Sequence, residues 1–358
     1  MRAQVLHSRI ASALYVLYRA RDPMTRLMKV VFLAFAILAL GAALQAGSAQ
    51  SISVIFALRP KGHLGGGAAL SHDATKIAYV GPPVPLGALH VVDIASRTDR
   101  VLTREGVACD PSFSPDGKRI VFSLSGGTWH YPSDIYSVRL DGTGLTQLTH
   151  SKPAELNDKG EYATEFAGDY AEYFYTPKYS PDGSEILVWR DPGTTRTNPT
   201  ELAITISPDG SGIRVLTEGK PLGWAEMGKA IFIQTDQCAF CKYELGSRTI
   251  KPIRGFDEMD VLGKLRGKDT FAVDNHGWLT LVTVTDLAAG SSRILPLPTT
   301  MTLALDDLRA LRPHLKPEFL SASGDLRLEE VSSDSSGSYL ILRYSGDIAE
   351  VLQVVKIN

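Results

Sequence analysis

A unit of about 40 residues repeats along the chain, and a repeat of this length restricts the possible folds more than any other feature of the sequence. Residues 110–149 and 176–217 align end to end. Each contains an apolar strand, a Ser-Pro-Asp-Gly turn, an alternating strand, a variable loop, a third strand, an Asp-Gly turn and a closing Leu-Thr. Proline fixes φ at the start of the turn, and glycine accepts a positive φ at its end. Each unit therefore predicts four antiparallel strands.

Weaker copies of the unit flank these two, at residues 68–103, 221–254, 258–297 and 325–358. Stacked solenoid repeats are the alternative architecture, but four strands in about 40 residues are the composition of a propeller blade. We therefore predict an all-β fold over residues 50–358, a six-bladed β-propeller of four-stranded antiparallel blades.

The two ends of the repeat region are complementary. The last unit contains three evident strands, while residues 52–58 form a strand-like run that belongs to no unit. A closed ring leaves no exposed sheet edge, which removes a site of aggregation. We expect the N-terminal strand to complete the last blade.

The N-terminal region has the pattern of a secretory signal. Residues 30–44 are an apolar run, with basic residues before it and small residues after it. The run is shorter than the roughly 20 residues that span a bilayer. We therefore predict a signal peptide over residues 1–49, a periplasmic or secreted location and no stable membrane span after cleavage. An uncleaved membrane anchor is the alternative. Residues 1–23 make the segment before the apolar run unusually long for a signal peptide, which suggests a misplaced start codon.

Charge and composition exclude some classes of partner and cofactor. The 37 basic and 39 acidic residues give a formal charge of −2, so the basic surface that a nucleic-acid backbone requires is missing. No cofactor is predicted. Acidic side chains suit Ca²⁺, but no calcium-loop spacing supports a structural calcium ion, and the histidines are scattered without metal-ligand spacing.

The strong units carry a family resemblance. Residues 110–122 read DPSFSPDGKRIVF, and residues 134–138 and 141–149 continue as DIYSV and DGTGLTQLT. This pattern resembles the WD40-like blade signature of TolB-type propellers, without the separate domain that precedes the propeller in TolB. The resemblance implies a six-bladed ring in the periplasm and a non-enzymatic scaffold that binds an envelope protein or peptide. Similar blades accompany the hydrolase domain of prolyl-oligopeptidase-like enzymes, but the chain has no Gly-x-Ser-x-Gly motif.

Loop lengths indicate where a binding site lies. Because blade strands alternate in direction, the short turns share one end of the sheets and the longer loops share the other. Binding residues concentrate on loops that a rigid scaffold holds. The insertion at residues 150–174 mixes acids with tyrosines, which suits a basic peptide or a carbohydrate, although a solvated covering loop is the alternative. The predicted binding residues are Trp129, His130, Tyr131, Glu165, Asp169, Tyr170, Glu172 and Tyr173, with Asp110 from an inner strand.

An enzymatic function is the second hypothesis. Propellers of this blade type also occur in polysaccharide lyases, which need a base and a charge stabiliser at one site. The sequence offers only His130 and the acids of residues 155–172 for these roles, so we assign no catalytic residue.

Two further segments carry structural expectations. Cys238 and Cys241 lie between two predicted strands, where an exported protein is expected to form a small disulfide. Cys109 begins an inner strand and is expected to be buried and unpaired. In the insertion at residues 298–324, leucines at helical spacing predict a short packing helix.

Overall fold

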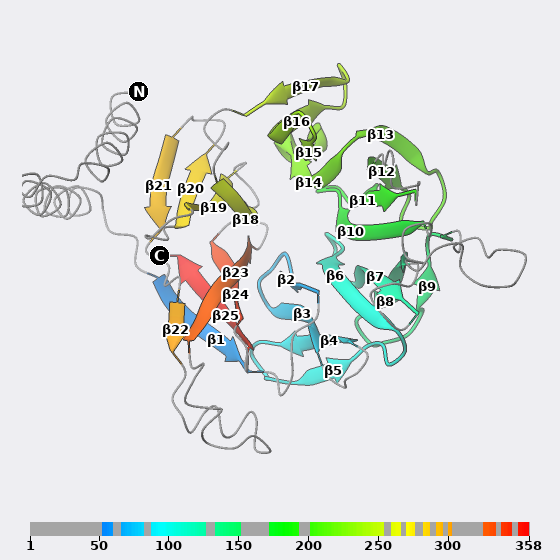
Figure 1. The fold of residues 1–358 in the computed structure, drawn as a ribbon. Helices are drawn as coiled ribbons and strands as arrows, with labels where there is room; N and C mark the ends of the chain where they lie inside the picture. The colour runs from blue at the N-terminus through cyan, green and yellow to red at the C-terminus, as the bar shows by residue number, and fades with distance from the viewer. Residues whose placement is uncertain are drawn as a thin grey trace, which may run out of the picture. The chain divides into compact units, whose positions relative to one another are not determined.

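The computed structural model describes most of the repeat region (Figure 1). All described residues fall in the second of two compact units of the chain, residues 52–358. Within them the only helical element is a 3-10 turn, η2 (Glu226–Gly228). The described residues are 52–59, 66–81, 87–126, 133–151, 172–192, 201–253, 259–265, 270–275, 282–286, 291–295, 300–302, 325–333, 338–345 and 350–357.

The described strands form six antiparallel sheets, five of them with four strands. In the four-stranded sheets the strand order follows the chain. The first two sheets are β2 (Ala68–Leu70), β3 (Lys76–Gly81), β4 (Ala88–Asp93) and β5 (Asp99–Val101), then β6 (Val107–Phe113), β7 (Arg119–Ser125), β8 (Ser133–Arg139) and β9 (Thr146–Gln147). The third and fourth are β10 (Tyr173–Tyr179), β11 (Ile186–Asp191), β12 (Leu202–Ile206) and β13 (Arg214–Glu218), then β14 (Lys220–Ala225), β15 (Ala230–Thr235), β16 (Cys238–Glu244) and β17 (Thr249–Pro252). The fifth is β18 (Met259–Leu265), β19 (Thr270–Asn275), β20 (Val282–Asp286) and β21 (Ser291–Leu295).

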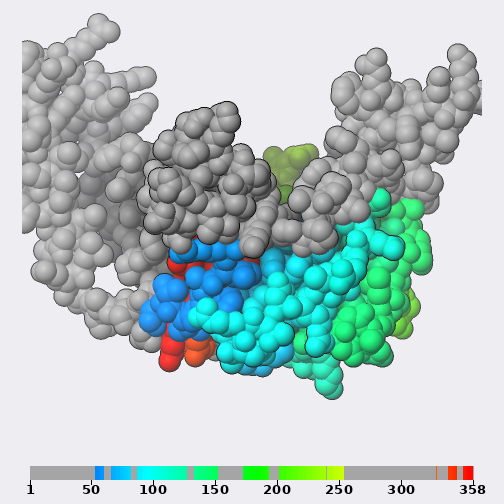
Figure 2. All heavy atoms as spheres, turned by 90° about the horizontal axis from the view of Figure 1, so that it is seen from below, coloured from blue at the N-terminus to red at the C-terminus, as the bar shows by residue number. Residues whose placement is uncertain are grey.

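The remaining sheet joins the two ends of the repeat region. It has five strands in the order β22 (Thr300–Thr302), β23 (Asp325–Ser333), β24 (Tyr339–Ser345), β25 (Glu350–Ile357) and β1 (Ile52–Leu58). Pairing between β1 and β25 runs from Ile52 opposite Ile357 to Leu58 opposite Leu352. Figure 2 shows the blue N-terminal residues beside the red C-terminal residues. The expected pairing of the N-terminal strand with the last unit is therefore present.

The sequence-based expectations differ from this sheet in one respect. Strand β22 lies within residues 298–324, which the sequence assigns to an insertion, and it gives the sheet a fifth strand. Its threonines are β-branched and favour extended structure. The helix expected around Leu305–Leu311 lies outside the described residues. The predicted all-β fold of repeated four-stranded antiparallel sheets is confirmed.

Apolar side chains pack between consecutive sheets. Strand β1 contributes Phe56 to a cluster with Ile77 of β3 and Ile341 of β24. Further along the chain, β3 and β4 pack on β6, β7 and β8, and the next clusters join β7 and β8 to β10, β11 and β12. Trp224 of β14 packs against Leu187 of β11. Strand β18 contacts β23, and β2 contacts both β6 and β23. From the sheet that contains β1 round to the sheet of β14–β17, neighbouring sheets thus bury apolar faces against one another, which is the pattern that layered β-proteins require.

The Ser-Pro-Asp-Gly turns are held by their own side chains. In one of them the Ser180 hydroxyl donates to Asp182 Oδ1 at 2.7 Å, and the Ser184 amide donates to the same oxygen at 3.1 Å. Gly183 closes this turn with φ 77°. The turn of residues 114–117 has the same bonds, with Ser114 2.6 Å from Asp116. Local side-chain bonds of this kind specify a turn independently of the rest of the fold.

These bonds make the turns sensitive to acid. The Ser180 hydroxyl, followed by the Ser184 amide and hydroxyl, lowers the pKa of Asp182 from 3.8 to about 2. A carboxyl group with a lowered folded-state pKa contributes stability above its unfolded value, and this contribution is lost as the pH falls through the folded value. The free energy of unfolding is therefore expected to fall between pH 3.8 and about 2.

Urea unfolding at a series of acidic pH values measures this effect. The Asp182→Asn variant should show a flatter dependence than the native chain over that interval. The matched control is Asp236→Asn, at an exposed aspartate for which the described residues supply no hydrogen bond. Equal slopes for the native chain and Asp182→Asn would contradict the assignment.

Candidate functional site

The first strands of two neighbouring sheets are interrupted at the same place. Pairing of β6 with β7 shifts between Cys109 and Ser112, and pairing of β10 with β11 shifts between Tyr175 and Lys178. Each bulge contains a residue with positive φ followed by proline: Asp110 at 52° and Thr176 at 49°. Left-handed conformations are costly for residues other than glycine, especially β-branched ones. Such strain is common where a fold directs side chains into a site.

Backbone bonds hold Asp110 in this conformation. Its amide donates to the carbonyl oxygen of Gly66 at 2.5 Å, and its carboxylate accepts a bond from the Thr176 amide. Gly66 has no room for a side chain, because a Cβ atom there would lie 2.5 Å from Cys109 Sγ. Asp110 therefore ties β6 to β10 and to the segment that precedes β2.

The Asp110 carboxyl is half-buried in a charged neighbourhood. Burial raises its pKa above the ordinary value, while the positive charges of Lys178, Lys220 and Arg343 act in the opposite direction. Desolvation is the larger effect, as expected for a carboxyl held away from water.

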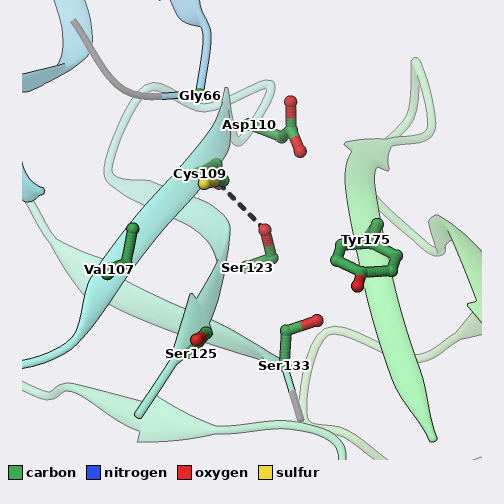
Figure 3. Close-up of a pocket in the computed structure, with 8 residues that line it drawn as sticks. All are labelled: Gly66, Val107, Cys109, Asp110, Ser123, Ser125, Ser133 and Tyr175. Carbon is green, nitrogen blue, oxygen red and sulfur yellow. Dashed lines mark hydrogen bonds between the residues drawn. The ribbon is translucent and has the colours of Figure 1, made fainter. Parts of the chain in front are cut away.

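A small cavity of about 240 Å³ opens beside this carboxyl. In Figure 3 the hydroxyl groups of Ser123 and Ser133, the Asp110 side chain and the Tyr175 ring border one space between β6 and β10. The residues that line the cavity are Gly66, Val107, Cys109, Asp110, Ser123, Ser125, Ser133 and Tyr175. They come from the ends of strands that lie away from the Ser-Pro-Asp-Gly turns, where the longer connections leave the sheets.

Two other ionisable groups in the lining stay protonated at neutral pH. Burial, with a smaller contribution from the Asp110 charge, raises the pKa of the Cys109 thiol to about 12. Burial also raises the pKa of the Tyr175 phenol, with Tyr173 adding to the effect. A thiol needs a lowered pKa to act as a nucleophile. The cavity therefore offers hydrogen-bonding groups rather than an activated nucleophile.

Aromatic rings form one wall beside the cavity. Tyr173 and Tyr175 stack with centroids 5.5 Å apart, and Tyr175 meets Trp189 at 5.1 Å. The Lys220 ammonium lies 4.4 Å from the centroid of the Trp189 ring. Among the described residues, the Trp189 ring N–H and the Thr176 hydroxyl are buried without a hydrogen-bond partner. Buried polar groups are nearly always satisfied, so these two atoms are open to a ligand or to water.

Three residues predicted from sequence lie in this region. Asp110 lines the cavity, Tyr173 is buried under Tyr175, and Glu172 is 4% exposed. Arg190 Nε and Nη2 both lie 2.6 Å from Glu172 Oε1. This ion pair gives Glu172 a structural role in the sheet of β10–β13. The other predicted binding residues, Trp129, His130, Tyr131, Glu165, Asp169 and Tyr170, lie outside the described residues.

The cavity also includes residues that the sequence reading missed. Ser123, Ser133 and Tyr175 lie within strands, where an alternating pattern does not distinguish a cavity wall from an ordinary sheet surface. One signal was available, since Asp110-Pro111 and Thr176-Pro177 occupy the same position of the two strong units. A proline inside an inner strand indicates a bulge.

The two other cysteines form a disulfide away from this cavity. Cys238 and Cys241 are bonded to each other, and Cys109 is a free thiol of intermediate exposure. The sequence places the pair between two predicted strands, but β16 begins at Cys238, and only Asp236 and Gln237 form the turn. The apolar and β-branched residues on both sides extend the hairpin further than expected.

A search of the described ranges finds no cluster of three or more His, Cys, Asp or Glu side chains able to hold a metal ion. It also finds no helix there with the length and apolar character needed to cross a bilayer.

The described residues define an all-β protein of repeated four-stranded antiparallel sheets, which is the composition of propeller blades. No family model matches the chain. Among curated proteins, the Tol-Pal system protein TolB of Francisella tularensis subsp. mediasiatica is 24% identical over 232 residues, covering 57% of this chain and 49% of that protein. The chain thus spans about half the length of the curated relatives it matches. Over the matched residues the chain is thus similar to TolB.

Several kinds of protein are among the solved structures that resemble the chain, including a putative TolB and a lyase. A putative TolB from Agrobacterium tumefaciens is 20% identical, with a TM-score of 0.36 and 65% of each chain covered. An oligogalacturonate lyase from Vibrio parahaemolyticus is 9% identical, with a TM-score of 0.48 and coverage of 82% of this chain and 79% of the lyase.

Proposed function

We propose that this chain is a non-enzymatic propeller of the cell envelope that binds a protein or peptide at the end of its sheets where the cavity lies. In this proposal residues 1–49 export the chain, and the six sheets close into a ring through β1. Supporting this are the pairing of β1 with β25, the signal-like sequence and the matches to TolB. The partner in this proposal is an envelope protein or peptide segment.

The chemistry of the cavity lining carries the preference for binding over catalysis. Burial raises the pKa of Asp110, Cys109 and Tyr175 alike. A lyase needs a base and a charge stabiliser directed at one substrate. A cavity with one carboxyl group, and with a thiol and a phenol that stay protonated at neutral pH, suits recognition through hydrogen bonds and aromatic contact instead.

The aromatic rings beside the cavity also favour binding over catalysis. Tyrosine and tryptophan supply large, rigid contact area and are enriched at protein interfaces. The half-buried rings of Tyr175 and Trp189 provide such a surface, with Tyr173 stacked behind Tyr175. The buried Trp189 N–H and Thr176 hydroxyl are groups that a bound peptide can satisfy.

Affinity capture from an envelope extract tests the proposal. The full chain is used as bait beside Tyr175→Ala, which removes one wall of the cavity, and Asp116→Asn, a control in a turn at the other end of β6. A partner retained by the native chain and the control, but reduced at least about tenfold by Tyr175→Ala, is the expected result. The purified partner should then bind the purified chain directly. Equal retention by all three baits would contradict this site.

A polysaccharide lyase is the second candidate. The aromatic wall beside Lys220 is the observation that favours it, because sugar rings stack on aromatic faces and acidic sugars attract a lysine. A screen of acidic and neutral oligosaccharides decides between the two functions. Turnover that is lost in His130→Ala would establish the lyase and overturn the binding-only proposal.

A further inference from the structure

We propose that the cavity beside Asp110 receives one positively charged group, the ammonium or guanidinium of a basic side chain. The inference rests on the proposed function, since it specifies the chemistry of the segment that the propeller binds. Three observations carry it: the charge of the lining, the direction of its hydrogen bonds and the size of the space.

Among the described residues, the lining contains a single carboxyl group and no cationic side chain. Asp110 is the acid, and its companions are small, hydroxylated, sulfur-containing or aromatic residues. The cations nearest to Asp110 lie outside the lining, and two of them have other contacts. Lys220 lies over the Trp189 ring, and Arg343 Nη1 is 3.9 Å from Glu350 Oε2. A half-buried carboxyl that contacts no cation of the described residues is a favourable site for an incoming one.

The hydroxyl groups of the cavity present acceptors. The Ser133 hydroxyl donates to the Phe174 carbonyl oxygen at 2.9 Å, and the Ser123 hydroxyl donates to the Cys109 carbonyl oxygen at 3.3 Å. The Tyr175 phenol has Ser133 as a hydrogen-bond partner. A hydroxyl has one proton and two lone pairs, so a hydroxyl that has committed its proton can only accept from a ligand. The space therefore selects a donor of several N–H bonds, such as an ammonium or guanidinium group.

Asp110 keeps capacity for such a donor. An ionised carboxylate has about four acceptor positions, and the Thr176 amide occupies one of them. The left-handed backbone of Asp110 and its bond to Gly66 fix the side chain before the ligand arrives. A pre-organised acceptor loses little freedom on binding.

The volume of the cavity limits the guest to one side chain. At about 240 Å³ it is smaller than the roughly 300–1,000 Å³ of pockets that enclose drug-sized ligands. The flanking rings of Tyr175 and Trp189 suit the aliphatic stem of lysine or the planar end of arginine. An oligosaccharide would contact this cavity through one substituent only.

Cation binding should depend on pH. The groups that act on Asp110 are Lys178 of β10, Lys220 of β14, Arg343 of β24 and, within β6, the neutral Cys109 thiol. A cation in contact favours the ionised carboxyl, whereas burial favours the protonated one. Affinity should therefore rise with pH as Asp110 loses its proton, and protonation should weaken binding on the acidic side.

The free thiol of Cys109 in the same cavity provides a direct measure of whether the cavity is occupied. Cys109 is the free thiol of the chain, because Cys238 and Cys241 are joined, so its alkylation at alkaline pH reports occupancy. Three probes of similar length are compared on the native full chain: Nα-acetyl-lysine methylamide, its norleucine analogue and its glutamate analogue. The lysine probe is expected to slow alkylation at concentrations about tenfold lower than either of the others. Protection by the glutamate probe, or equal protection by all three, would overturn the inference.

Variants extend the test. Asp110→Asn should weaken protection by the lysine probe about tenfold, while Asp116→Asn, an equal charge change in a distant turn, should leave it unchanged. An unchanged response in Asp110→Asn would also overturn the inference. The comparison of probes on the native chain decides the question even if Asp110→Asn does not fold. If the lysine probe protects Cys109 selectively but no partner is captured, only the proposed function fails. If a partner is captured but the lysine probe gives no selective protection, only the inference fails.

Discussion

Replacing Phe56 by alanine is expected to lower the free energy of unfolding by about 3–5 kcal/mol. Phe56 lies in β1, is 4% exposed and packs in one cluster with Ile77, Ile341 and Leu352. The substitution leaves a cavity between the sheet that ends the chain and the sheet of β2–β5. Deleting residues 52–58 should have a larger effect, because it also removes the pairing partner of β25.

Urea and thermal unfolding measure this effect, and β1 supplies its own control. Val54 lies two residues away on the same strand but is 57% exposed, so Val54→Ala should change stability by no more than about 0.5 kcal/mol. A Phe56→Ala variant as stable as Val54→Ala would mean that β1 does not contribute to the core, and the proposed closure of the ring would fail with it.

Replacing Arg190 by alanine is expected to cost about 3–5 kcal/mol, because it leaves a buried carboxylate without its cation. Glu172 is 4% exposed, and both Arg190 nitrogens lie 2.6 Å from its Oε1. Arg190 also lies over the Phe174 ring, with its guanidinium carbon 5.9 Å from the centroid. The variant therefore loses both an ion pair and a ring contact in the sheet of β10–β13.

A double-mutant cycle separates these contributions. The Glu172→Gln/Arg190→Met double variant should be more stable than Arg190→Ala alone, because it removes both charges and retains an apolar stem over Phe174. Chemical denaturation of the native chain, the single variants and the double variant provides the measurement. Additive losses would show that the two side chains are not coupled, which would contradict the described ion pair.

The fold was largely predictable because its signals are local. Each Ser-Pro-Asp-Gly turn is stabilised by bonds between its own residues, as Ser180 and Ser184 show with Asp182, so a short window of sequence specifies it. The alternating strands on either side then follow. The pairing of β1 with the last sheet was also predictable, since an unassigned strand and an incomplete unit were both visible in the sequence.

The cavity was harder to predict because it depends on backbone conformation. Asp110 and Thr176 adopt left-handed φ values that their residue types do not predict. The bulges at these residues shift the register of the residues that follow. Ser123, Ser133 and Tyr175 meet only after neighbouring sheets have packed. Glu172 was predicted as a surface ligand because neighbouring acids suggested an exposed loop, yet its partner Arg190 lies on the next strand.

The pairing of β1 with β25 also bears on how the chain is made. A chain that emerges N-terminus first exposes residues 52–58 early, but their partner, residues 350–357, is made after all the other described strands. Contacts between such distant segments form slowly, and an unpaired apolar strand is prone to aggregate while it waits. The earlier sheets can fold in turn as they are completed, whereas the final sheet must wait for the whole chain. A molecule truncated near its C-terminus would therefore leave both the beginning and the end of the repeat region unfinished.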